Sequence, residues 1–220
     1  VSETLAMAAK ARELKNKGID IIGLSLGEPD FNTPEFIKDA AIQAVKDNYN
    51  SYSPVDGYAD LKQAICAKFK RDNNLNYSPS QIVVSTGAKQ SIANLCMVLL
   101  DPGDEVLLPA PYWVSYSAIA TLAEATSIII PSSIETDFKI TPEQLEAFIT
   151  PKTKLVMFNS PNNPSGTIYT EAEYRALGKV LEKYPNIFIL SDEIYEHINY
   201  GTEHSSIAAI PELYDRTITV

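Results

Sequence analysis

Short apolar runs alternate with amphipathic segments along almost the whole of this 220-residue sequence. Two of the runs are apolar at every position, Leu155-Val156-Met157-Phe158 and Ile187-Phe188-Ile189-Leu190. A strand without polar positions is typical of a parallel sheet that helices cover on both faces. The alternation therefore predicts an α/β fold of three layers, α/β/α, built around a mostly parallel sheet.

The individual segments can be placed from their periodicity, turn residues and capping signals. The predicted helices span residues 2–17, 34–47, 58–72, 88–100 and 113–123, and two more begin after capping boxes at Thr141 and Thr170. The predicted strands span residues 19–26, 82–85, 105–108, 127–130, 154–159, 187–191 and 217–220. We expect the chain to cross between domains in the proline-containing stretch Gly27 to Pro34.

The composition excludes several classes of protein. The formal net charge is -10 and the isoelectric point is about 4.7, so the surface repels nucleic acid and anionic membranes. No apolar run approaches the length that spans a bilayer. Cys66 and Cys96 lie in apolar helical patterns without a CxxC spacing, which indicates reduced core thiols in a cytoplasmic protein.

Three motifs follow predicted strands at their carboxyl ends, where open parallel sheets collect their ligands. They are Thr86-Gly87-Ala88-Lys89, Asn159 to Gly166 and Asp192 to Tyr195. The glycine of the first motif lets N–H groups at a helix start point at an anion, although many ordinary turns also contain glycine. The second motif fixes an irregular turn, in which Asn163 either has a function or satisfies its own backbone.

Asp192 follows a wholly apolar strand, and burying a carboxylate there without a partner is costly. A protonated pyridine nitrogen would be a suitable partner, and a helix cap or a salt bridge is the alternative. Glu193 and His197 are four residues apart, but no HExxH pattern or third ligand accompanies them, so no metal site is expected. Taken alone, Trp113 indicates core packing and Tyr52 indicates surface packing.

These motifs, with further segments in the same order, resemble the class I pyridoxal-phosphate-dependent aminotransferases of fold type I. The resemblance covers essentially the whole sequence and is strongest to the bacterial aspartate aminotransferase branch of that family. The matching segments are Gly27 to Phe31, Gly57, Gly87 to Gln90, Asp101 to Glu105, Pro111 to Trp113, Asn159 to Gly166 and Ser191 to His197.

The resemblance implies pyridoxal 5′-phosphate as the cofactor and assigns contacts to it. The contacts are phosphate binding by the backbone at Ala88 and Lys89, ring packing by Trp113, 3′-oxygen binding by Asn163 and Tyr195, and protonation of the ring nitrogen by Asp192. The resemblance also implies a homodimer, because Tyr52 would reach the phosphate of the partner subunit.

The resemblance assigns substrate contacts as well. Gly27 would offer its backbone to the substrate α-carboxylate, which Asn163 would also bind, and Trp113 would contact the substrate as well. Lys89 would meet the distal carboxylate of aspartate or glutamate.

The resemblance further implies that residues 1–35 form an N-terminal arm and part of a small domain, and that residues 36–220 form an incomplete large domain. The lysine that forms a Schiff base with the cofactor would lie beyond Val220. The chain is therefore expected to be an N-terminal fragment that is inactive by itself, and no catalytic residue is assigned within it.

The expected activity of the parent protein is transamination between an L-amino acid, aspartate or glutamate, and a 2-oxo acid, 2-oxoglutarate or oxaloacetate. One alternative is an aromatic or kynurenine-type aminotransferase, or a C–S lyase, of the same fold. A second alternative is the non-catalytic cofactor-binding domain of a regulator. The substrates would be small molecules, and neither nucleic acid nor a membrane is expected as a partner.

Overall fold

The computed structural model describes residues 3–23, 27, 31–201 and 203–220. The chain divides into two compact units, Val1–Tyr52 and Ser53–Val220. The first unit contains helices α1 (Glu3–Asn16) and α2 (Glu35–Lys46). The second unit contains every described strand and is the part that carries the candidate site. The domain boundary expected at residues 35 and 36 concerns the whole protein and stays a prediction.

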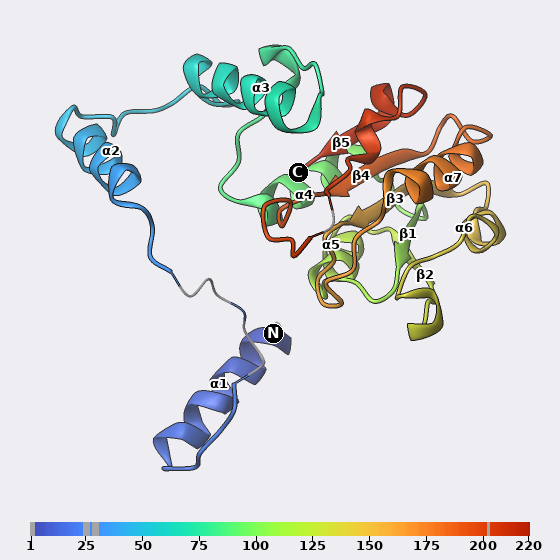
Figure 1. Cartoon of the computed structure of the whole chain (residues 1–220), viewed down its shortest axis with the longest axis horizontal. Coiled ribbons are helices and arrows are strands. Elements are labelled where there is room, and N and C mark those ends of the chain that lie inside the picture. Colours follow the sequence, from blue (N-terminus) through green and yellow to red (C-terminus); the bar gives the residue numbers. More distant parts are fainter. Residues whose placement is uncertain (1–2, 24–26, 28–30, 202) are drawn as a thin grey trace. The chain divides into compact units, whose positions relative to one another are not determined.

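The second unit is built on a five-stranded sheet with the strand order β2-β1-β3-β4-β5 (Figure 1). All four neighbouring pairs are parallel, which confirms the predicted α/β class. The strands are β1 (Glu105–Pro109), β2 (Thr126–Ile130), β3 (Thr153–Asn159), β4 (Phe188–Asp192) and β5 (Thr217–Thr219). All their carboxyl ends therefore lie at one edge of the sheet.

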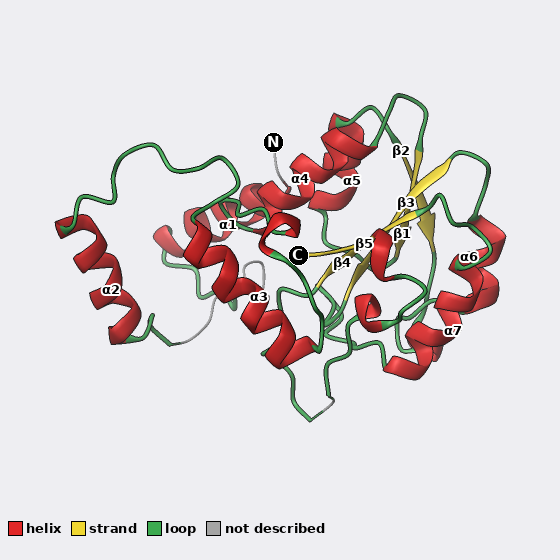
Figure 2. Cartoon of the chain, turned by 90° about the horizontal axis from the view of Figure 1, so that it is seen from above, coloured by secondary structure: helices red, strands yellow, loops and turns green. Residues whose placement is uncertain are grey.

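Helices cover both faces of this sheet, as the doubly apolar strands predict (Figure 2). The helices of the second unit are α3 (Ala59–Asn73), α4 (Ala88–Leu99), α5 (Ser115–Leu122), α6 (Pro142–Phe148) and α7 (Glu171–Leu181). On one face, α4 and α5 pack on Val106 and Leu108 of β1. On the other face, α6 and α7 pack on Leu107, because successive strand residues point to opposite faces.

Both predicted capping boxes are present and explain where two helices begin. The Thr141 side chain accepts from the Gln144 amide at 3.2 Å, and the Gln144 side chain accepts from the Thr141 amide at 2.9 Å. Thr170 and Glu173 repeat this reciprocal pairing at the start of α7. Each box satisfies backbone donors that the first turn of a helix leaves without an intrahelical partner.

Two predicted strands are wrong. Residues 82–85 form no strand, and the Val84 amide instead donates to the Asp56 carbonyl at 3.1 Å. Residues 19–23 are also irregular, and the rest of that predicted strand, 24–26, lies outside the described residues. A strand requires a neighbour to complete its hydrogen bonds, and none of the described segments pairs with either run.

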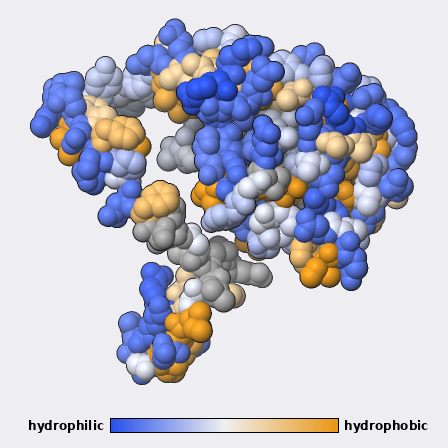
Figure 3. Space-filling view, viewed as in Figure 1, coloured by the Kyte–Doolittle hydropathy of each residue, from blue (hydrophilic) through white to orange (hydrophobic). Residues whose placement is uncertain are grey.

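Smaller differences concern helix boundaries and the surface of the first unit. Pro34 precedes α2 with an extended ψ of 143°, instead of occupying its first turn. The α2 side chains Phe36 and Val45 are both 74% exposed, and Figure 3 shows apolar residues at the surface of this unit. None of the described helices is both long enough and apolar enough to cross a bilayer.

Gly57 provides a test of the packing beneath α3. Its φ is +100°, and a Cβ built there would lie 2.5 Å from Cγ2 of Val84. Gly57→Ala should therefore destabilise the protein through backbone strain, about 1–2 kcal/mol, and through overlap with a branched side chain, about 1–3 kcal/mol more. Urea unfolding, followed by the fluorescence of Trp113, measures the sum.

Gly103 is the matched control for this substitution. Its φ is +94°, but a Cβ there meets no atom within 4 Å. Gly103→Ala should show the strain without the overlap, so it should cost less free energy of unfolding than Gly57→Ala. Equal losses in the two variants would contradict the contact with Val84.

Candidate functional site

The candidate site lies where β3 and β4 end side by side. Asn159 is the last residue of β3 and is paired in register with Asp192, the last residue of β4. Both residues are buried, with 6% and 4% of their surface exposed. The parallel register thus brings two predicted motifs together that are far apart in the sequence, as the common edge of a parallel sheet requires.

The Asn159 side chain connects these two motifs. Its Nδ2 donates to the Asp192 carbonyl oxygen at 2.9 Å, and its Oδ1 accepts from the Asn163 amide at 2.7 Å. Asn163 is thereby held near the loop after β4, where its Nδ2 lies 3.4 Å from the Tyr195 hydroxyl. The structure therefore brings together Asn163, Asp192 and Tyr195, all of which the sequence singled out.

The turn after β3 combines both interpretations that the sequence left open. Asn162 satisfies the turn itself, because its Oδ1 accepts from the Ser165 amide at 3.0 Å and from the Ser165 hydroxyl at 2.8 Å. Gly166 closes the turn with a φ of +74°, in the region that favours glycine. Asn163 differs, since its side-chain amide is directed to Tyr195 rather than to the backbone of the turn.

Asp192 is a buried carboxylate without a counter-charge in the described structure. Its Oδ2 accepts from the Tyr116 hydroxyl at 2.5 Å, and its Oδ1 accepts from the Ile194 amide at 3.3 Å. Burial raises the pKa of Asp192, while the hydrogen bond from Tyr116 acts in the opposite direction. No basic group among the described residues lowers this pKa. The salt bridge considered from the sequence is therefore not found in the described residues.

Lys89 and Trp113 meet at the start of α4. The Lys89 Nζ atom lies 4.7 Å from the centre of the Trp113 ring, a cation–π contact. The Trp113 ring in turn meets the Tyr116 ring edge to face, with centroids 5.5 Å apart. These contacts extend the site from Asp192 to α4 through aromatic side chains.

The backbone at the start of α4 is suited to an anion. Gly87 precedes the helix with a φ of +85°, which places the first turn directly after a sharp change of direction. The Ala88 and Lys89 amides donate to no acceptor within the part of the chain that the structure describes. Free amides at a helix N-terminus, together with the helix dipole, favour a bound phosphate or carboxylate.

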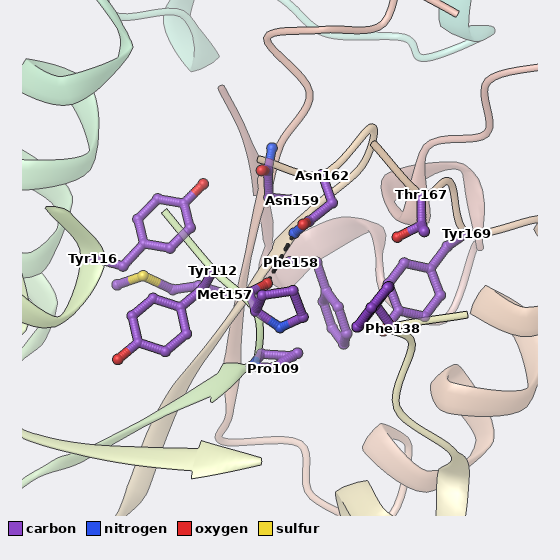
Figure 4. Close-up of a pocket in the computed structure, with 11 residues that line it drawn as sticks. Pro109, Tyr112, Tyr116, Phe138, Met157, Phe158, Asn159, Asn162, Thr167 and Tyr169 are labelled. Carbon is purple, nitrogen blue, oxygen red and sulfur yellow. Dashed lines mark hydrogen bonds between the residues drawn. The ribbon is translucent and has the colours of Figure 1, made fainter. Parts of the chain in front are cut away.

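A small pocket is lined by Tyr116 and Asn159, both of which form hydrogen bonds to Asp192 (Figure 4). Tyr112, Tyr116, Met157 and Phe158 contribute to its wall, together with Asn159. The dashed line in Figure 4 marks the hydrogen bond from Asn162 Nδ2 to the Pro111 carbonyl at 3.2 Å, which ties the two loops that border the pocket. The burial of Tyr116 and Asn159 strengthens their hydrogen bonds, because little water competes with them.

A cluster next to the site contains Glu193, Glu196 and His204. Their ligand atoms lie within 4.8 Å of one another, a spacing that a metal ion could bridge. Glu193 already accepts from Ser191 at 2.7 Å, Ser206 at 2.6 Å and the ring of His204 at 2.9 Å. Glu196 is paired with Lys68. Protein donors thus satisfy both carboxylates, and the arrangement is accounted for as an internal hydrogen-bond network.

The remaining predicted site residues belong to the first unit. Gly27 is exposed and Tyr52 is fully exposed there, and the neighbours Glu28 to Asp30 lie outside the described residues. Their roles at the α-carboxylate and at a partner's phosphate stay predictions. The sequence did not indicate a role for Tyr116, and it did not distinguish Asn159 from the rest of its motif. Tyr116 sits in an apolar helical pattern, so only its contact with Asp192 distinguishes it from core.

The fold and the site define a class of protein. The family model described as aminotransferase class I and II matches residues 19–220. The chain therefore belongs to the class I and II aminotransferase family. This agrees with the resemblance inferred from the motifs.

Two named relatives are similar to this chain over its whole length. The aspartate/prephenate aminotransferase of Nitrosomonas europaea is 51% identical over 100% of this chain and 56% of its own length. The aspartate aminotransferase of Bacillus subtilis is 49% identical over 100% of this chain and 56% of its own length. The chain thus spans about half the length of the relatives it matches.

Two solved aminotransferase structures are also similar to this chain over its whole length. The aspartate aminotransferase of Rhizobium meliloti superimposes with a TM-score of 0.96 at 46% identity, over 100% of this chain and 55% of that one. The Thermus thermophilus aspartate aminotransferase with maleate gives a TM-score of 0.95 at 39% identity, over 100% of this chain and 56% of that one.

The raised pKa of Asp192 predicts how stability depends on pH. A carboxyl whose folded pKa lies above its unfolded value of 3.8 favours the folded state when protonated. That contribution is complete below the unfolded pKa and is lost as the pH rises through the folded pKa. Asp192→Asn, which stays neutral and can still accept from Tyr116, should therefore stabilise the cofactor-free protein at pH 7.

Urea unfolding of both proteins from pH 3 to pH 8 tests this prediction. The advantage of Asp192→Asn should shrink as the pH falls, and it should reach its minimum below the unfolded pKa of the carboxyl. A difference in the free energy of unfolding that stays constant over this range would show that the charge of Asp192 does not oppose folding.

Proposed function

We propose that the protein to which this chain belongs binds pyridoxal 5′-phosphate at the ends of β3 and β4. The observation that carries the proposal is Asp192, a buried carboxylate for which the described residues supply no cation. A protonated pyridine nitrogen provides the missing positive charge and a donor for one carboxylate oxygen. The unfavourable free energy of burying the Asp192 carboxylate would then be offset by its interaction with the cofactor.

Other described groups fit the rest of the cofactor. The Asn163 amide and the Tyr195 hydroxyl adjoin each other at 3.4 Å and offer hydrogen bonds to the 3′-oxygen. The free amides of Ala88 and Lys89 suit the phosphate. Trp113, held between Lys89 and Tyr116, provides an aromatic surface for the ring. These groups come from separate elements that the parallel sheet brings to one edge.

The proposed reaction is transamination between an L-amino acid and a 2-oxo acid. The bound cofactor would supply an electron sink for the bond that is broken at the substrate α-carbon. Asp192 would hold a proton on the ring nitrogen, which maintains that sink. The names of the relatives are those of aminotransferases, and no observation favours a C–S lyase or a regulator.

Lys89 favours an acidic amino acid as the substrate. Lys89 is exposed, and its ammonium group lies over the Trp113 ring. Aspartate and glutamate carry a second carboxylate that such a group can pair with, and 2-oxoglutarate and oxaloacetate carry one too. We therefore place aspartate and glutamate first among the amino donors.

The proposal extends to the whole protein. We propose that this protein is a cytoplasmic homodimer, in which Tyr52 reaches the cofactor phosphate of the partner subunit. Gly27 would contact the substrate α-carboxylate. Its free thiols, Cys66 and Cys96, agree with a reducing compartment. The lysine that bonds the cofactor is proposed to lie beyond Val220, in keeping with relatives that are nearly twice as long.

Turnover of the protein at the length of its relatives tests the proposed function. The protein is loaded with pyridoxal 5′-phosphate, and oxaloacetate formation from aspartate and 2-oxoglutarate is followed. Asp192→Ala should nearly abolish turnover, because an unprotonated ring is a poor electron sink. Near-normal turnover with the cofactor still bound would rule out the role of Asp192. An inactive wild-type protein would contradict the proposed reaction.

Lys89→Ala tests the substrate class in the same protein. Loss of one charged hydrogen bond should lower kcat/KM for aspartate and glutamate by about ten- to a hundredfold. Alanine and phenylalanine should be affected much less, and cofactor affinity should change little because the backbone of residue 89 remains.

Lys154 is the matched control for Lys89. It also forms a cation–π contact, 5.8 Å from the ring centre of Phe188, and it lies on β3 away from the carboxyl end. Lys154→Ala should leave the preference for acidic substrates unchanged. Equal, small effects of Lys89→Ala on all four amino acids would remove the reason for assigning an acidic substrate.

A further inference from the structure

Tyr116 is a buried residue in contact with the most important carboxylate of the site. It lies in the first turn of α5, and only 1% of its surface is exposed. Its ring belongs to the apolar core between α4, α5 and the sheet. Its hydroxyl donates to Asp192 Oδ2 at 2.5 Å. No functional role for Tyr116 follows from its position in the sequence.

Packing alone does not explain a tyrosine at this position. Phenylalanine would fill the same apolar space without burying a hydroxyl group, and a buried hydroxyl destabilises the fold unless it has a partner. Burial raises the pKa of Tyr116 far above its ordinary range, and the adjacent charge of Asp192 raises it further. The hydroxyl therefore stays protonated at physiological pH and can act only as a donor to an ionised Asp192.

The surroundings of Asp192 show why this donor matters. Glu193, the next residue, opposes ionisation of Asp192 by its own negative charge. From β3, the uncharged Asn159 contacts only the backbone of Asp192. The Ile194 amide donates to Oδ1 at the longer distance of 3.3 Å. Two further titratable groups lie around Tyr116 and Asp192. They are Tyr195, on the loop after β4, and Lys89, on the other side of the Trp113 ring. The hydrogen bond from Tyr116 is thus the shortest that the Asp192 carboxylate accepts within the described residues.

We propose that Tyr116 is a positioning residue that keeps Asp192 ionised and fixes its carboxylate, leaving Oδ1 for the ring nitrogen of the cofactor. A neutral Asp192 cannot supply the negative charge that holds a proton on that nitrogen. The hydrogen bond favours the anion against the effects of burial and of Glu193. The bond also holds Oδ2 in one place, so the two oxygens have different tasks. This inference rests on the proposed function for its consequence, but the contact itself does not.

The titration of Asp192 in the cofactor-free protein tests the contact directly. Aspartate labelled with carbon-13 at the side-chain carboxyl is followed by NMR, and the Asp192 signal is identified by its absence in Asp192→Asn. Tyr116→Phe keeps the ring and removes the donor. It should raise the pKa of Asp192 by about one to two pH units, the equivalent of one lost charged hydrogen bond. A pKa that matches the wild type would overturn the proposal.

Tyr112→Phe is the matched control. Tyr112 lines the same pocket and packs on the same apolar core, but among the described residues its hydroxyl makes no hydrogen bond. Its removal should leave the pKa of Asp192 unchanged. A shift as large as that in Tyr116→Phe would show that any change in the pocket alters Asp192, and it would overturn the specific role of Tyr116.

A double-mutant cycle protects the test against a loss of stability in Tyr116→Phe. If the two side chains interact, the single variants Tyr116→Phe and Asp192→Ala, each of which removes the hydrogen bond, should not have additive effects on urea unfolding at pH 7. Additive effects would overturn the interaction. If Tyr116→Phe unfolds, the double variant with Asp192→Asn should regain stability, because no unpaired buried charge remains.

Turnover separates this inference from the proposed function. With aspartate as the donor, Tyr116→Phe should lower kcat by about ten- to a hundredfold while KM changes little, because Tyr116 acts through Asp192 and does not contact the substrate. A wild-type protein without turnover contradicts the proposed function, whereas the NMR titration still decides the contact. Normal kcat in Tyr116→Phe, in a protein that does transaminate, would overturn the positioning role.

Discussion

The burial of one carboxylate determines the arrangement of the candidate site. Asp192 is 4% exposed at the end of a strand whose preceding positions are almost all apolar, and no basic group of the described structure balances its charge. Each neighbour supplies part of what water would otherwise give. Tyr116 donates to one oxygen, the Ile194 amide to the other, and Asn159 holds the backbone in register. No described group supplies a positive charge, and the proposed cofactor would supply it through its protonated ring nitrogen.

The buried Asp192 carboxylate, which the proposed function requires, lowers the free energy of unfolding at neutral pH. A buried carboxylate with a raised pKa weakens the folded state at neutral pH, whereas a neutral amide of the same shape would not. Groups whose pKa is displaced by burial cluster at functional sites for this reason. Glu193, the adjacent residue, provides the contrast. Its carboxylate is equally buried, but two hydroxyls and His204 satisfy it, so it requires no ligand.

The parallel sheet makes the site possible because it collects distant segments at one edge. Asn159 and Asp192 are opposite each other only through the register of β3 and β4. The turn after β3 then carries Asn163 to Tyr195, and the loops before α4 and α5 bring Lys89 and Trp113 to the same edge. A change in the register of β3 and β4 would separate Asn159 from Asp192, and with them the two motifs that these residues connect.

The sequence by itself determined the α/β class, the strands β1 to β5 and both capping boxes, because each depends on local periodicity or on short-range hydrogen bonds. The family was indicated separately, by the resemblance of its motifs to those of known aminotransferases. It was wrong about residues 19–23 and 82–85, whose apolar composition suits a strand but whose described surroundings provide no pairing partner. Only the tertiary structure revealed Tyr116 as a partner of Asp192 and Asn159 as the link to Asn163. A tyrosine in an apolar helical pattern looks like core until a residue 76 positions away is placed against its hydroxyl, and that placement depends on packing across the whole sheet.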